Sequence, residues 1–295
     1  MTTEVIITGT GCPVPDADRA GPGVLVRYGE TTLQFDAGRA TVNRLTAAEV
    51  WLPNLSALFV THHHSDHLTG LQDVVMTRWI MDREDRSTAI PIVAPAGPAC
   101  GYVEDMLLPW RHDLAVRKEH TGRTRDPAID LRPFELPDDP TEVWSDRDVR
   151  VLAGQVRHEP VHPAVGFRVE TPDGAVVISG DTLVCDEMAE LSAGADIVIY
   201  EALRFEVIER LAEHRRFILD YHADTRLIGA QAAELGVPTL VLTHLIPVPQ
   251  SEAEKDLFVE DIRRGGFEGD LLVADDLDSV VLSAGQKPMI RRASE

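Results

Sequence analysis

The most constraining feature of this chain of 295 residues is a short run of potential metal ligands, His62-His-His-Ser-Asp-His67. It directly follows an apolar, strand-like run and precedes a helix-like one. In an extended or tightly turning loop, residues i and i+2 point the same way, so His62 and His64 can bind one ion. Asp66 and His67 lie past the turn and can reach a second ion. Imidazole and carboxylate ligands together suit zinc first, with manganese or iron as alternatives.

Three further candidate ligands, His158, Asp181 and His244, follow strand-like runs later in the chain. Loops beyond strand ends are where α/β folds place their active sites. Counting assigns three residues to each of two ions, with Asp181 as a carboxylate that can bridge both. The first ion would be held by His62, His64 and His158, and the second by Asp66, His67 and His244. This leaves open positions for a bridging water, as in catalytic rather than structural sites.

Strand-like and helix-like segments alternate along the whole chain, which is typical of a layered α/β domain. The clearest helix is expected over Ser251–Arg264, where Ser251 and Glu254 form a capping-box pattern and Gly265 can end the helix. A second helix is expected over Thr225–Leu235.

We expect a single domain over residues 1–285, followed by a flexible tail over 286–295. Residues 105–148 are expected to form a variable insertion or lid near the active site. Within them, the stretch between Pro109 and Pro140 is the one irregular part of the chain. Loops of this length in compact domains are usually functional lids or disordered segments.

Composition argues against several classes of protein. No apolar run reaches the roughly 18 residues of a spanning helix, so we expect no membrane association. The N-terminus has no basic stretch or cleavage site typical of a secretory signal. Three scattered cysteines, Cys12, Cys100 and Cys185, indicate free thiols in a reducing compartment. We therefore expect a cytoplasmic protein.

The net charge is −21, from 49 acidic and 28 basic residues. Such a chain repels polyanions over its surface, and extended nucleic-acid binding would need a dedicated basic patch. Nothing in the composition shows one. We therefore expect that nucleic acid is not a partner.

The sequence resembles the metallo-β-lactamase superfamily, and within it the ribonuclease Z-like and arylsulfatase-like branch. The resemblance spans nearly the whole chain. Beside the ligand motif, it rests on Thr8-Gly-Thr-Gly-Cys-Pro13, Arg19-Ala-Gly-Pro22, Leu33-Gln-Phe-Asp-Ala-Gly-Arg39 and the segment from His158 to Arg168. It implies an α/β fold of the αββα sandwich type, with two mixed β-sheets flanked by helices. It also implies that Asp36 is a buried carboxylate behind the metal ligands.

Departures from the family pattern narrow the function. Ribonuclease Z carries a tRNA-gripping arm between its third histidine and its bridging aspartate, but only 23 residues separate His158 from Asp181 here. Together with the net charge, this spacing argues against a tRNA 3′-processing endonuclease. The best-known β-lactamases use a cysteine at the second metal, and no cysteine matches here. The di-iron branch has glutamate where this chain has His64.

The leading hypothesis is a dinuclear metal-dependent hydrolase whose bridging hydroxide attacks a small phosphodiester or sulfate ester. Two divalent ions lower the pKa of a bridging water towards about 7. Asp66, His222 and Glu201 are the expected catalytic residues. His222 lies 22 residues before His244, the spacing that the branch uses between its catalytic and last metal-binding histidines. We expect His222 to protonate the leaving group and Glu201 to orient its imidazole.

Alternatives remain open at this point. The same metal pair can open a lactone, carboxyl ester or amide, while a tRNA 3′-processing endonuclease ranks below both. A non-catalytic, metal-stabilised scaffold would not need His222 and Glu201. The expected partner is a small-molecule ester, and a homodimer is an open possibility. His63, His112, His120 and His214 are expected to lie outside the site, and His162 is undecided.

Overall fold

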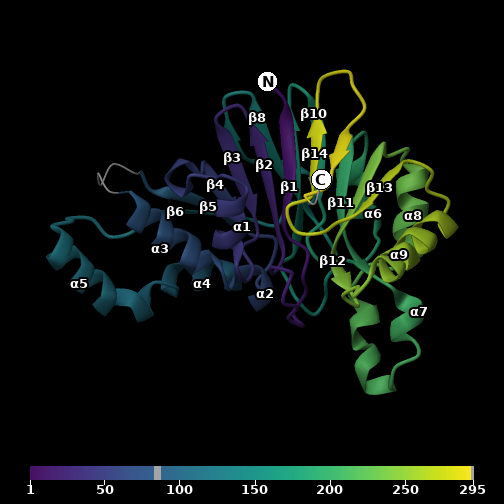
Figure 1. Ribbon diagram of the computed structural model, residues 1–295, viewed down its shortest axis with the longest axis horizontal. Helices are drawn as coiled ribbons and strands as arrows, with labels where there is room; N and C mark the ends of the chain where they lie inside the picture. The colour runs from purple at the N-terminus through teal and green to yellow at the C-terminus, as the bar shows by residue number, and fades with distance from the viewer. Residues whose placement is uncertain (83–87, 294–295) are drawn as a thin grey trace.

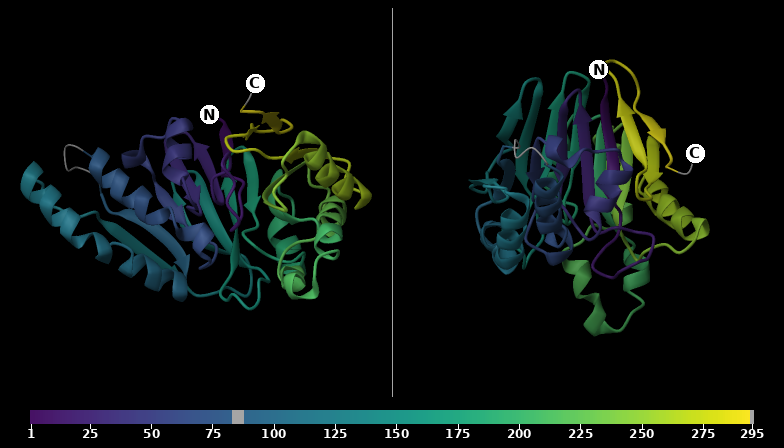
Figure 2. Two further views of the ribbon diagram at one scale, coloured as in Figure 1. Left: turned by 60° about the horizontal axis from the view of Figure 1, so that its bottom comes forward. Right: turned by 60° about the vertical axis from the view of Figure 1, so that its left-hand side comes forward.

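Two β-sheets pack face to face, with helices on their outer faces (Figures 1 and 2). The computed structural model describes residues 1–82 and 88–293, apart from the side chain of Arg215. The first sheet has eight strands, in the order β15 (Met289–Arg291), β14 (Ser279–Leu282), β1 (Thr3–Gly9), β2 (Gly23–Tyr28), β3 (Thr31–Phe35), β4 (Ala57–Phe59), β5 (Ile90–Pro95) and β6 (Ile129–Phe134). The second has seven, in the order β13 (Asp270–Val273), β12 (Thr239–Ile246), β11 (Ile197–Leu203), β10 (Gly174–Ile178), β9 (Val165–Thr171), β8 (Val149–Gln155) and β7 (Thr141–Asp146).

The helices divide between the two outer faces. Those that follow strands of the first sheet are α1 (Thr41–Ala47), α2 (Ser65–Leu68), α3 (Leu71–Met81), α4 (Pro98–Asp105) and α5 (Arg111–Thr121). Those on the side of the second sheet are α6 (Asp186–Ser192), α7 (Phe205–Ile208), α8 (Thr225–Glu234) and α9 (Glu252–Arg264). The described residues also contain three 3₁₀ helices, namely η1 (Leu52–Asn54), η2 (Leu108–Trp110) and η3 (Glu213–Asp220).

Three apolar layers hold these elements together. The layer between the sheets contains Phe35, Phe59 and Phe167, whose ring centroids lie 4.6 to 5.5 Å apart. A second layer joins the first sheet to α1, α3 and α4, and a third joins the second sheet to α6, α8 and α9. Strand β11 is buried at every position because it is covered on both faces. The expected αββα sandwich is therefore confirmed.

The expected helix over Ser251–Arg264 is present as α9, and its start is set by the predicted cap. The Ser251 hydroxyl accepts a hydrogen bond from the Glu254 backbone N–H at 3.3 Å. The Glu254 carboxylate accepts from the backbone of Gln250, one residue earlier than a capping box requires. The helix expected over Thr225–Leu235 is present as α8, with Asp224 as its cap.

Two segments that are expected from the sequence to be irregular contain regular structure. The stretch between Pro109 and Pro140 contains α5 and β6, because β6 pairs in parallel with β5 and extends the first sheet. Part of the tail expected over 286–295 forms β15, which pairs with β14. Residues 294–295 lie outside the described residues.

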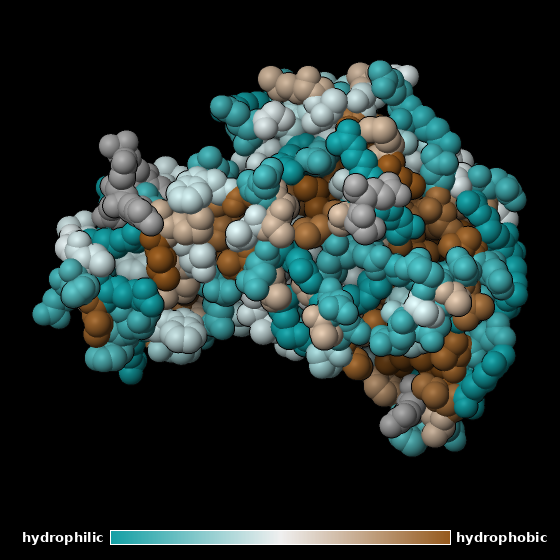
Figure 3. All heavy atoms as spheres, viewed as in Figure 1, coloured by the Kyte–Doolittle hydropathy of each residue, from teal (hydrophilic) through white to brown (hydrophobic). Residues whose placement is uncertain are grey.

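On the face drawn in Figure 3, the end of the molecule that carries α5 is largely hydrophilic. In α5 only Leu114 is buried. Within residues 1–82 and 88–293, no helix has the length and apolar character needed to cross a membrane.

Candidate metal centre

All seven predicted ligands converge at one edge of the sandwich. Strands β8, β10 and β12 run in the same direction within the second sheet, so their carboxyl ends meet at that edge. His158 follows β8, Asp181 follows β10, and His244 lies near the end of β12. The motif beginning at His62 follows β4 of the facing sheet. Six of the seven side chains are buried, and only His64 is half-buried.

One group of ligand atoms comes from His62, His64, His158 and Asp181, all within 4.8 Å of one another. The nitrogens His158 Nε2 and His64 Nδ1 are 3.2 Å apart. Asp181 Oδ2 lies 3.8 Å from the Nε2 atoms of both His62 and His158. This group could hold one metal ion.

A second group comprises Asp66, His67 and His244, again with ligand atoms within 4.8 Å. His244 Nε2 lies 3.4 Å from Asp66 Oδ2 and 3.5 Å from Asp181 Oδ2. The other oxygen of Asp181, Oδ1, lies 3.3 Å from His67 Nε2. Asp181 therefore faces both groups at once, as a carboxylate shared between two ions must.

Hydrogen bonds on the far sides of the imidazole rings fix their orientation. His67 Nδ1 donates to Asp36 Oδ2 at 2.7 Å, and His158 Nδ1 donates to the carbonyl of Tyr221 at 2.8 Å. The Thr61 hydroxyl donates to Asp36, so it accepts from His62 Nδ1 at 3.0 Å. Such bonds select the tautomer whose Nε2 lone pair is free for a ligand bond.

Two observations indicate that these ligand residues could bind a metal cation. Buried Nε2 atoms of His62 and His67, and Oδ1 of Asp181, have no hydrogen-bond partner among the described residues. Burial, followed by the neighbouring His158, lowers the pKa of His64 to about 4. Burial also holds the pKa of His62 well below its usual value. These imidazoles are therefore neutral at pH 7, with lone pairs available to a metal.

The carboxylate at the centre of the cluster stays ionised. Burial raises the pKa of Asp181, but the imidazoles of His244 and His67 outweigh it and hold the pKa well below its usual range. Burial lowers the pKa of His67, yet Asp181 and Asp36 outweigh this effect and raise it well above its usual value. Negative charge is thus concentrated at the second group. A metal cation bound there would replace the proton of the His67 imidazole.

The backbone at two ligands adopts conformations that aim their side chains. His244 has φ 46°, unusual for a residue with a side chain. It is the extra residue in a register shift, because Glu201 pairs with Thr243 and Ala202 pairs with Leu245. Gly180 has φ 62°, and a Cβ there would lie 2.9 Å from the Cβ of Thr61. That glycine lets the chain pass beside Thr61 just before Asp181.

His222 and Glu201 form a buried pair beside the second group. His222 Nδ1 donates to Glu201 Oε1 at 2.8 Å, and the same oxygen accepts from the backbone of Thr182 and Ala223. Burial lowers the pKa of His222, but the carboxylate of Glu201 outweighs it and raises the pKa to about 9. His222 can also approach Asp181 and His244 as a third ligand group. The pair can hold a proton next to the ligand cluster.

The remaining histidines do not join these groups. His63 lies in the motif but enters none of the possible metal groups among the described residues. His112, His120 and His214 are exposed on α5 and η3. His162 is also outside the groups. Sequence reasoning missed Thr61 and Tyr221, whose contributions are a neighbouring hydroxyl and a backbone carbonyl with no residue-type signal.

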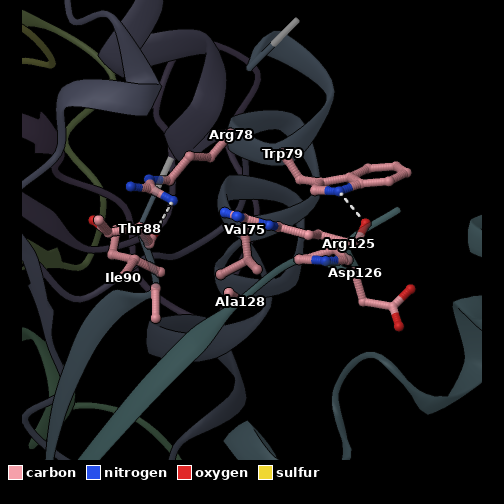
Figure 4. A pocket seen from close by; sticks show the side chains of 10 residues that line it. Val75, Arg78, Trp79, Thr88, Ile90, Arg125, Asp126 and Ala128 are labelled. Carbon is pink, nitrogen blue, oxygen red and sulfur yellow. Dashed lines mark hydrogen bonds between the residues drawn. The ribbon is translucent and has the colours of Figure 1, made fainter. Parts of the chain in front are cut away.

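A separate cavity of about 110 Å³ lies near the start of β5, between α3 and the approach to β6 (Figure 4). There Arg78 Nη1 donates to the carbonyl of Thr88 at 3.0 Å, and Trp79 Nε1 donates to that of Arg125 at 3.1 Å. Because β4 and β5 are parallel, the start of β5 lies at the opposite end of the sheet from His62. This cavity is therefore not part of the candidate metal centre.

Residues 30–245 match a family described as "Beta-lactamase superfamily domain". The chain belongs to this superfamily. A member from Mycolicibacterium gilvum named "Ribonuclease Z" is 37% identical over 284 residues, which cover 96% of this chain and 97% of the relative.

Solved structures of superfamily members show the same fold. The metallo-beta-lactamase fold protein YhfI from Bacillus subtilis has a TM-score of 0.71 at 20% identity and covers 95% of this chain and all of its own. The short form of human tRNase Z has a TM-score of 0.67 at 20% identity and covers 97% of this chain and all of its own. The predicted family and the metallo-β-lactamase fold are thus confirmed, and the protein is a hydrolase of this fold.

The expectation that nucleic acid is not a partner is wrong. The superfamily member named Ribonuclease Z aligns over 97% of its own length, so it has no large insertion that this chain lacks. A short gap between His158 and Asp181 therefore does not exclude a ribonuclease. The net charge of −21 also fails as an argument, because it sums over the whole chain and says nothing of the field at one edge.

Proposed function

We propose that the protein is a phosphodiesterase that uses two divalent metal ions to cleave RNA, and that zinc is the preferred metal. The seven ligand residues would hold the ions in two groups of three around the shared carboxylate of Asp181. Bound there, the ions would supply a nucleophilic water and polarise the phosphate. Two findings support RNA as the substrate, namely the relatives named Ribonuclease Z and the buried pair of His222 and Glu201.

The single observation that carries the proposal is the 2.8 Å contact between His222 Nδ1 and Glu201 Oε1 beside the ligand groups. A ribose leaves a phosphodiester as a poor alkoxide, and such a leaving group needs a proton in the transition state. His222 keeps its proton at neutral pH because Glu201 stabilises the imidazolium. A phenolate leaving group would need no such device. The pair therefore favours an alkyl phosphodiester, which is the bond that joins nucleotides.

The test is a substrate panel assayed with the zinc-loaded protein. A precursor tRNA and a short single-stranded RNA are compared with an aryl phosphodiester, an aryl sulfate and a lactone. We expect cleavage of RNA and of the aryl phosphodiester, and loss of both activities with a chelator. Turnover of only the sulfate or only the lactone would overturn the proposal in favour of that ester class. Cleavage of the aryl phosphodiester without RNA would restrict the substrate to small phosphodiesters.

A further inference from the structure

Residues 204–221 form an excursion from the second sheet. The excursion begins directly after β11 and ends directly before His222, so its two ends lie side by side. The Leu203 N–H donates to the carbonyl of Ala223 at 2.9 Å, which closes the base of this excursion. It contains α7 and η3 and projects beyond the body of the protein, below β12 in Figure 1. Figure 2 shows the same protrusion from another side. Its last residue, Tyr221, leads directly into His222.

A row of rings runs from the metal centre into this excursion. The Tyr221 ring lies 5.1 Å from that of His158 at an interplanar angle of 88°, and 4.8 Å from that of His222. The Phe217 ring lies 6.2 Å from Tyr221 at 39°. These are the distances of interacting aromatic pairs. The row therefore connects a predicted metal ligand and the predicted proton donor to Phe217.

Exposure increases outward along the row. His158 and His222 are buried, Tyr221 is half-buried, and Phe217 is 58% exposed. Tyr221 is held in place because its carbonyl accepts the hydrogen bond from His158 Nδ1. The outer rings thus lie next to the site and are partly exposed to solvent, while the inner end is buried and fixed.

We propose that Phe217 and Tyr221 form an aromatic platform on which a nucleobase next to the scissile phosphate stacks. The inference rests on the proposed function, which supplies a substrate with bases on either side of the bond. Every base has a flat π-face, and proteins that bind single-stranded RNA use exposed aromatic rings in this way. The two rings are specificity-determining residues and take no part in bond breaking.

An exposed apolar residue alone would not justify this assignment, since single ones are common on protein surfaces. Trp51 shows the contrast. It is 53% exposed and makes no ring contact within the part of the chain that the structure describes. Phe217 differs because it extends a row that begins at the metal centre. Trp51→Leu is therefore the matched control for Phe217→Leu, which keeps an apolar side chain but removes the ring.

The test measures binding, so it does not depend on turnover. Isothermal titration of the zinc-loaded full chain compares adenosine 5′-monophosphate with ribose 5-phosphate, in which a hydroxyl replaces the base. We expect the nucleotide to bind about tenfold more tightly, the effect of one stacked base. Phe217→Leu should abolish the difference, while Phe217→Trp and Trp51→Leu should keep it. Melting temperature and metal content confirm that each variant is folded and loaded.

Equal binding of the two ligands by the unaltered protein would overturn the platform, as would a tenfold preference retained by Phe217→Leu. A Phe217→Leu change that splits a dimer into monomers would also overturn it, because the ring would then pack on a second copy. RNA cleavage is measured in parallel. If RNA is not cleaved but the nucleotide still binds more tightly than ribose 5-phosphate, the proposed function is wrong and the platform stands. If RNA is cleaved but the two ligands bind equally, the platform is wrong and the proposed function stands.

Discussion

The metal centre and the helix α5 place charged residues in opposite settings. At the candidate metal centre, every ligand side chain except that of His64 is buried, and each lies close to several others. In α5 only Leu114 is buried, and its charges meet solvent. The pair Arg117–Asp113 is 45% and 39% exposed at 2.7 Å. Exposed pairs of this kind contribute about 0.5 kcal/mol or less.

The difference shows where a charge matters. A buried carboxylate such as Asp181 acts on several neighbours at once and raises the pKa of His67, so its removal changes the whole site. A charge on α5 interacts mainly with water and with one partner. We therefore expect effects of substitution to fall steeply from Asp181, through His222 and Asp36, to Arg117.

The largest effect is expected for Asp181→Ala. Because Asp181 faces both ligand groups, its loss should weaken both ions and leave activity at background. Zinc titration followed by elemental analysis should show more than one ion lost per chain. Asp186→Ala, an exposed acid at the start of α6, is the control and should keep full metal content. Retention of two ions by Asp181→Ala would show that its carboxylate is not shared.

His222→Ala should retain both ions and the fold, since the ligand groups are complete without it. Turnover of an alkyl phosphodiester should fall by roughly 10²- to 10⁴-fold, the usual range for a positioned general acid. An aryl ester, whose phenolate leaves unaided, should suffer least. Loss of a metal ion would instead make His222 a ligand. An equal loss on both esters would give it a role other than proton donation.

The same histidine predicts a pH dependence. A general acid must be protonated, and Glu201 raises the pKa of His222 to about 9. The metal cations that activity requires lower this pKa, so the rate on an alkyl ester should fall as pH rises through a value at or below about 9. His222→Ala should lose this alkaline decline. A decline that persists unchanged in the variant belongs to another group.

Asp36→Asn should have an intermediate effect. It removes the charge that accepts from His67 Nδ1 at 2.7 Å, so the imidazole becomes a weaker ligand. Metal affinity should fall about 10- to 100-fold, as for other partners of metal-binding histidines. Competition with a fluorescent chelator measures this change. Glu30→Gln, an exposed carboxylate paired with Arg147, should leave the affinity unaltered.

Arg117→Ala should have the smallest effect. Its exposed pair with Asp113 should be worth about 0.3–0.5 kcal/mol in the free energy of unfolding. Urea denaturation can measure this difference. A loss well above about 1 kcal/mol would mean that α5 contributes to the core, and the contrast between the two regions would fail.

That the candidate ligands lie together was largely predictable because the signals are local. The His62–His67 motif and the strand-end residues Asp181 and His244 stand at positions that topology brings to one edge. Asp36 and His222 came from the family resemblance, and the structure places both in the cluster. The role of the seven residues as metal ligands and that of His222 as proton donor remain predictions.

Other features could not be read from residue types. The bond from His158 to Tyr221 ends on a backbone carbonyl 63 residues away, which any amino acid could supply. The register shift at His244 depends on pairing between β11 and β12. Helix α5 is mostly polar, so it lacks the broad apolar face that marks a buried helix. The prediction that nucleic acid is not a partner failed because the net charge of the whole chain does not describe the charge at any one part of its surface.

The central claim is that the seven residues form one site for two metal ions. Elemental analysis of the zinc-saturated, gel-filtered protein tests it most directly, with protein concentration from amino-acid analysis. We predict two zinc ions per chain. A value of one or less that added zinc does not raise would contradict the shared role of Asp181 and the two-metal site.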